Sequence, residues 1–67
     1  MANTSPHQYY RCYFMREGRI VAYEDVFSYD DDRAIEKARE ILSGESYPTI
    51  ELWRGKELVA VLERDNS

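Results

Sequence analysis

The side chains that could carry out chemistry in this 67-residue sequence are few. His7 is the only histidine and belongs to a polar N-terminal segment, and nothing in the sequence indicates a second ligand or a nucleophile to act with it. Cys12 is the only cysteine, and its alternation with Tyr10 and Phe14 predicts a buried, unreactive thiol. The three glycines stand apart in the sequence, so no phosphate-binding loop is formed. We therefore expect no catalytic residue, no cofactor and no enzyme activity.

The carboxylates gather at Asp30, Asp31 and Asp32. Calcium and magnesium bind several oxygen ligands, but this run lacks the alternating positions, the Gly and the distant Glu of a calcium-binding loop. Three acids directly before an apolar periodic segment are typical of a helix start, where one caps the backbone amides and the others face the positive end of the helix dipole. We predict that Asp30 is the cap and that no metal site is present. Ser28 is the alternative cap, with Asp31 as the third residue of a capping box.

Four strands and one helix are predicted to position these side chains. Aromatic and β-branched residues in alternation predict strands over residues 9–15, 20–27, 49–53 and 58–62. Spacings of three and four predict one amphipathic helix, whose apolar stripe is Ile35, Ala38, Ile41 and Leu42. Gly44 is expected to end the helix in the left-handed conformation. The order of elements is ββαββ, which belongs to the α+β class.

Short turns set the expected strand registers. In the first hairpin, a three-residue loop over 16–18 would place Phe14 opposite Ile20 and Cys12 opposite Ala22. In the second hairpin, the pairs expected across the turn at 54–57 are Trp53 with Leu58, Leu52 with Val59 and Ile50 with Val61. Both registers would bring Ile20, Val59 and Val61 onto the face that packs against the helix.

The sheet order follows from the direction of the chain. Because the helix carries the chain back across the sheet, the second and third strands should run the same way. Placing the first strand between them gives a four-stranded antiparallel sheet in the order 2-1-3-4, with the helix packed on one face. Pairing the third strand with the second would instead give a parallel pair. The expected organisation is a disordered arm over 1–8, a single domain over 9–64 and a frayed end over 65–67.

Five side chains are expected to project from the sheet face opposite the helix: Tyr13, Val21, Tyr23, Trp53 and Leu58. A single helix covers only one face of a four-stranded sheet, and an exposed aromatic surface is typical of an interface. Alternatively, Arg11, Glu51 and Arg54 interrupt this surface, and the aromatic rings are present only because they favour strand geometry.

The composition narrows the class of partner. The formal net charge is −4, whereas binding to nucleic acid depends on clustered basic residues. No apolar run approaches the ~18 residues that a membrane span needs. The first four residues lack the basic and apolar regions of a secretory signal, so a cytoplasmic protein is expected.

We predict a non-catalytic protein-interaction module that self-associates, or binds an unidentified protein, through the aromatic sheet face. One alternative is a small regulatory, antitoxin-like protein whose arm or sheet edge becomes ordered on a partner. Another is a weak single-stranded nucleic-acid binder that stacks bases on its aromatic rings.

Three segments of the sequence together resemble a group of short bacterial proteins of unknown function. They are the Tyr-rich hairpin over 10–20, the helix Asp31-Asp32-Arg33-Ala34-Ile35-Glu36-Lys37-Ala38-Arg39 with its acidic start, and the hairpin Glu51-Leu52-Trp53-Arg54-Gly55. The resemblance spans residues 9–62. It implies a single domain of this fold in a bacterial cytosol, and it brings no catalytic or binding residues.

Overall fold

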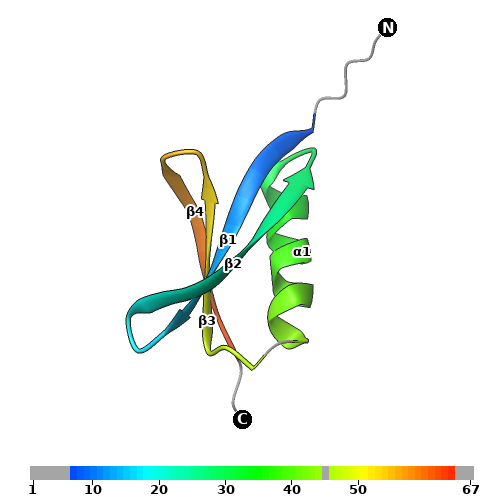
Figure 1. Ribbon diagram of the computed structural model, residues 1–67. Helices are drawn as coiled ribbons and strands as arrows, with labels where there is room; N and C mark the ends of the chain where they lie inside the picture. The colour runs from blue at the N-terminus through cyan, green and yellow to red at the C-terminus, as the bar shows by residue number, and fades with distance from the viewer. Residues whose placement is uncertain (1–6, 45, 65–67) are drawn as a thin grey trace, which may run out of the picture.

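The computed structural model describes residues 7–44 and 46–64, and Figure 1 shows their arrangement. The elements are β1 (Gln8–Arg16), β2 (Arg19–Ser28), α1 (Asp31–Ser43), β3 (Thr49–Arg54) and β4 (Glu57–Glu63). The strands form one antiparallel sheet in the order β2-β1-β3-β4, and α1 packs on one face. This confirms the ββαββ, α+β prediction and the pairing of β1 with β3. Residues 1–6 of the predicted arm and the predicted frayed end lie outside the described residues, and β1 begins at Gln8, within the range assigned to the arm.

The predicted register of the first hairpin is wrong. Its loop has two residues, Glu17 and Gly18, and both have positive φ (54° and 76°), as in a type I′ turn. The register then shifts by one residue in β2, so that Phe14 pairs with Ala22 and Cys12 with Glu24. This bulge turns Ile20 away from the core, and its side chain is 57% exposed.

The second hairpin was predicted correctly only next to its turn. Trp53 pairs with Leu58, and Gly55 has the positive φ (61°) expected of the first loop residue in a type II′ turn. A second bulge then pairs Leu52 with Ala60 and Ile50 with Leu62. Leu62 therefore enters the core instead of Val61, which is half exposed, whereas Val59 still packs against the core's edge.

Helix α1 begins where the acidic run predicted. Asp30 has extended backbone angles, and its Oδ1 accepts a hydrogen bond from the Arg33 amide at 2.8 Å, so Asp30 and not Ser28 is the cap. Ser28 is instead the buried end of β2. The helix ends at Gly44 without a left-handed residue, because Gly44 has φ −95° and its amide bonds the carbonyl of Ile41 at 3.1 Å. The prediction of a left-handed Gly44 was therefore wrong.

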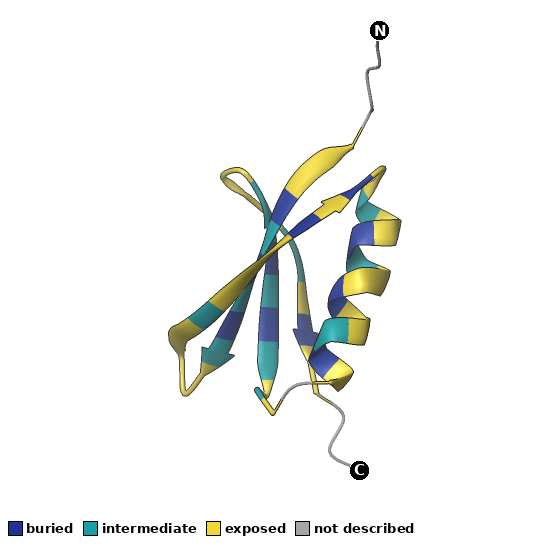
Figure 2. Ribbon diagram, turned by 45° about the vertical axis from the view of Figure 1, so that its right-hand side comes forward, coloured by how far each residue is buried: buried dark blue, intermediate teal, exposed yellow. Residues whose placement is uncertain are grey.

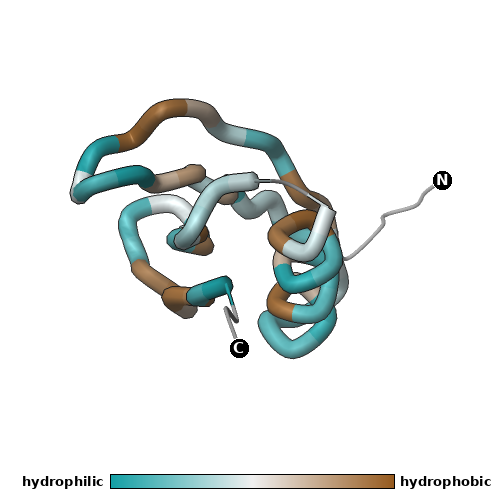
Figure 3. The backbone as a smooth tube through the Cα atoms, turned by 90° about the horizontal axis from the view of Figure 1, so that it is seen from below, coloured by the Kyte–Doolittle hydropathy of each residue, from teal (hydrophilic) through white to brown (hydrophobic). Residues whose placement is uncertain are grey.

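The core lies between α1 and the inner face of the sheet. Buried positions alternate along β1 and β3 and form a stripe on α1 (Figure 2). The buried apolar residues are Tyr10, Cys12, Phe14, Val26, Ala34, Ala38, Leu42, Ile50, Leu52 and Leu62. Of the predicted helix stripe, Ala38 and Leu42 are buried, while Ile35 and Ile41 are only partly buried. With the helix seen end-on, its apolar segments turn towards the strands (Figure 3).

Within residues 7–44 and 46–64, no helix combines the length and the apolar content needed to cross a membrane.

Candidate interaction surface

The sheet face that α1 leaves uncovered is called the outer face below. Residues opposite each other in an antiparallel ladder share a face, so the pairings identify its members. Tyr13 lies between Tyr23 and Glu51, and Arg11 lies between Asp25 and Trp53. Both hairpin tips bend to the side opposite α1, so they flank this face (Figure 1). Its exposed apolar residues are Tyr9, Ile20, Tyr23, Phe27, Leu58 and Val61.

The β2 side of the outer face is organised around Arg11. The Arg11 Nε lies 3.0 Å from Asp25 Oδ1, and its guanidinium lies 4.2 Å from the centre of the Tyr23 ring. The Tyr9 hydroxyl donates a hydrogen bond to the same Asp25 oxygen at 2.7 Å. Both hydrogen bonds lower the pKa of Asp25, and the bond from Tyr9 lowers it more than the bond from Arg11 does. Arg11 is therefore held towards β2 with its charge neutralised.

The β3 side of the outer face carries a carboxylate without a cation. Trp53 Nε1 donates a hydrogen bond to Glu51 Oε1 at 3.1 Å, which fixes the carboxylate beside the indole ring. Among the described residues, no basic group lies within ion-pair distance of Glu51. A shallow hollow of about 290 Å³ opens here, lined by Tyr13, Ile20, Glu51, Trp53 and Gly55.

The structure brings four of the five predicted interface residues onto one surface. Tyr13 and Trp53 are half-buried at its centre, and Tyr23 and Leu58 are exposed on the neighbouring strands. Val21 is the extra residue of the first bulge and is also exposed. Arg54, expected to interrupt this surface, instead donates to Asp31 on the helix side.

The sequence interpretation missed four of the exposed apolar residues of the outer face. The rings of Tyr9 and Phe27 are in contact at a tilted angle, with their centres 5.3 Å apart, near the end of the β1–β2 ladder. The alternation of Tyr9 with Arg11 and Tyr13 could have identified the first of them. Ile20 and Val61 could not be found in this way, because the two bulges reverse their orientation.

The aspartate run has structural partners. Asp31 accepts hydrogen bonds from the buried Tyr10 hydroxyl and from Arg54, and Arg54 also donates to Glu57. The Tyr10 bond is the main cause that lowers the pKa of Asp31, and the Arg54 bond is the second. These contacts tie the start of α1 to β1 and β3. No group of three or more metal-ligating side chains in the described part of the chain could hold an ion.

The two other residues that the sequence offered for chemistry, Cys12 and His7, also lie in contact with neighbouring residues of the fold. Cys12 is fully buried, and burial, reinforced by the charge of Glu24, raises its pKa to about 11, which suppresses the reactive thiolate. His7 stacks on Tyr29, with 4.3 Å between ring centres. The sequence assigned this residue to the disordered arm.

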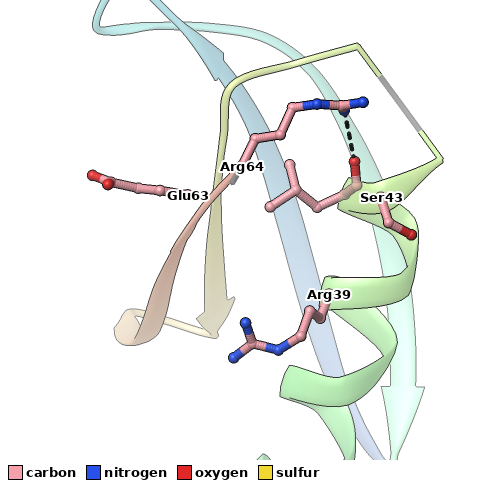
Figure 4. A pocket seen from close by; sticks show the side chains of 5 residues that line it. Arg39, Ser43, Glu63 and Arg64 are labelled. Atoms are coloured by element: carbon pink, nitrogen blue, oxygen red, sulfur yellow. Dashed lines mark hydrogen bonds between the residues drawn. The ribbon is translucent and has the colours of Figure 1, made fainter. Parts of the chain in front are cut away.

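A second cleft, of about 330 Å³, lies between the end of α1 and β4 (Figure 4). Arg39 and Arg64 line it, which raises the possibility of an anion site. However, Arg64 donates to the Leu42 carbonyl at 3.1 Å and so satisfies the end of the helix, which carries negative partial charge. Arg64 therefore stabilises the end of α1.

Comparison with known proteins finds no matching family model, no similar curated protein and no similar solved structure. The resemblance to short bacterial proteins stays a prediction.

Proposed function

We propose that this chain is a non-catalytic protein-interaction module that binds another protein surface through its outer face. The observation that carries this proposal is the concentration of exposed aromatic and aliphatic side chains on the one sheet face without a covering helix. Monomeric proteins rarely expose this many aromatic and aliphatic side chains on one face, and Trp and Tyr are the side chains that contribute most to binding at interfaces.

The polar groups of the outer face support this use. Burying a charged side chain beneath a partner costs free energy unless the charge stays paired, and Arg11 and Asp25 already pair with each other. The same pairing argues against the alternative of single-stranded nucleic acid, because within residues 7–44 and 46–64 it leaves no unpaired cation among the aromatic rings of this face, and Glu51 repels phosphate. No observation favours the antitoxin-like alternative.

The proposed setting is the cytoplasm of a bacterium. A lone, buried free thiol at Cys12 suits a reducing compartment, and the bacterial origin rests on the sequence resemblance.

The first test is the mass of the purified full chain by light scattering from about 10 µM to about 1 mM, which covers weak association. The matched variants are Tyr23→Ala and Tyr29→Ala. Both remove a tyrosine of similar exposure (57% and 47%), but Tyr23 lies in the outer-face ladder, whereas Tyr29 follows β2 and its ring lies beneath the guanidinium of Arg33 on α1. If the partner is a second copy, the mass should rise with concentration, and Tyr23→Ala should prevent this while Tyr29→Ala should not.

A monomeric result directs the test to a different partner protein. A photo-crosslinking phenylalanine at position 23 should then give one discrete adduct in an extract, and the same group at position 29 should not. Trp53→Ala should abolish the adduct, which separates specific capture from background. Equal labelling from both positions, together with a monomer at every concentration, would overturn the proposal.

A further inference from the structure

We infer that the hollow beside Trp53 is a recognition site for a cationic side chain of the partner protein, with arginine as the best fit. This inference rests on the proposed function and specifies the chemistry of the partner. It starts from Glu51, whose carboxylate lies among aromatic rings without a basic neighbour in the described structure.

The Glu51 carboxylate is prepared for a cation. The Trp53 indole donates to Oε1 at 3.1 Å and restrains the side chain, and no hydrogen bond or ion pair from the described residues reaches Oε2. A partner that covered the outer face with apolar groups alone would bury this charge unpaired, which is strongly unfavourable. A partner that supplies a cation would gain a charge-assisted hydrogen bond at the same position.

The walls of the hollow select the kind of cation. Tyr13, which pairs with Glu51 across the β1–β3 ladder, and Trp53, two residues further along β3, both line it, so an incoming cation meets aromatic rings as well as the carboxylate. A guanidinium is planar, stacks on aromatic rings and donates through a rigid fork, whereas an ammonium is a compact and strongly hydrated charge. The shallow hollow therefore favours arginine over lysine.

Arg11 does not occupy this place, although it is the cross-strand neighbour of Trp53. Its guanidinium lies over the Tyr23 ring and pairs with Asp25. Both of these residues belong to β2, which lies on the other side of β1 from Glu51. Among the described residues, the outer face thus has one arginine paired with a carboxylate on the β2 side and one carboxylate without an ion pair, Glu51, on the β3 side.

The probe for this site is N-acetyl-arginine amide, titrated into the isotopically labelled full chain and followed by NMR. The neutral isostere N-acetyl-citrulline amide is the matched ligand. We expect saturable shifts of the Trp53 indole and of the Tyr13 and Glu51 amides, with a dissociation constant on the order of millimolar for so small a contact. Citrulline amide should cause no saturable shift, and lysine amide should bind more weakly than arginine amide.

Two variants locate the site. Glu51→Gln keeps an acceptor for the indole but removes the charge, and it should weaken arginine amide binding about tenfold. Glu36→Gln removes the same charge from an exposed position on α1 and should leave binding unchanged. Equal shifts with citrulline amide, or wild-type affinity in Glu51→Gln with a well-dispersed spectrum, would overturn the inference. If crosslinking or mass measurements show outer-face binding while arginine amide causes no shift, the inference fails and the proposed function stands.

Discussion

Tyr10 and Tyr23 show how differently the two faces of this sheet use the same side chain. Tyr10 is fully buried beneath α1, and its hydroxyl donates to Asp31 at 2.7 Å. Tyr23 is 57% exposed, and the guanidinium of Arg11 lies over its ring in a cation–π contact. The inner face is held by close packing, in which each side chain depends on its neighbours. The outer face is held by pairwise contacts at the surface, so its side chains can change without loss of the fold and can serve binding.

The largest expected difference comes from leucines on the two faces. Leu52→Ala removes a fully buried side chain, and we expect the free energy of unfolding to fall by roughly 2–5 kcal/mol. Leu58→Ala, at a 48% exposed position, should cost about 0.5 kcal/mol or less in dilute solution. Urea denaturation measures both. Equal losses would show that the two faces are not energetically distinct, and a Leu58→Ala loss that grows with protein concentration would reveal an interface.

Removing tyrosine hydroxyls sharpens the same comparison. Tyr10→Phe deletes the donor to Asp31 and should lower the free energy of unfolding by about 1 kcal/mol. Tyr23→Phe keeps the ring beneath Arg11 and should leave stability unchanged within error. Thermal unfolding of the two variants in one buffer checks this. A greater loss in Tyr23→Phe would mean that the outer face depends on a hydroxyl contact of its own.

A pH titration should measure how much the contacts of Asp31 at the start of α1 contribute to stability. The pKa of Asp31 is lowered in the folded chain, chiefly by the Tyr10 hydroxyl and then by Arg54. The stabilisation from Asp31 is therefore fully present above its unfolded pKa of about 3.9, and it is lost as the pH falls through the lower folded value. Asp31→Asn should be less stable than wild type at pH 7, and the difference should shrink below about pH 4. Melting curves at a series of pH values test this, and a difference that stays constant down to acidic pH would contradict it.

The smallest expected effect concerns the buried end of β2. The Ser28 hydroxyl is buried without a hydrogen-bond partner in the described structure. Removing a buried polar group that makes no bond is neutral or stabilising, so Ser28→Ala should keep or raise the melting temperature. Calorimetry of this variant gives the answer, and a clear loss of stability would show that the hydroxyl has a partner in solution.

Local sequence patterns predicted much of the inner face. Tyr10, Cys12 and Phe14 alternate with polar or amphipathic neighbours, and all three are buried as expected. The cap at Asp30 was also predicted correctly, because capping depends on a few adjacent residues.

The errors concentrate where apolar residues follow one another without alternation. Residues 20–22 and 58–62 are apolar at every position, so a strand there can bury either set of alternate side chains. The two bulges determine which set is buried. They place Ile20 and Val61 on the outer face and Leu62 in the core.

The outer face also has residues that the sequence could assign and contacts that it could not. Tyr13, Tyr23, Trp53 and Leu58 could be assigned to the outer face from the sequence, since each lies in an alternating segment or next to a short turn. The pairing of Arg11 with Asp25, and the Glu51 carboxylate left beside Trp53, depend on which strands are neighbours and on the register between them.

The sequence by itself determined the order of the elements, because this follows from local hydrogen bonding and hydrophobic period, and it favoured the cap at Asp30 and the sheet order 2-1-3-4. The structure decided between that sheet order and a parallel pair of β2 and β3, and between Asp30 and Ser28 as the cap. Only the tertiary structure decided the two bulges, the members of the outer face and the separation of Arg11 from Glu51. The physical reason is that a bulge shifts the side-chain period by one residue, and its position is selected by the packing of the whole sheet against α1.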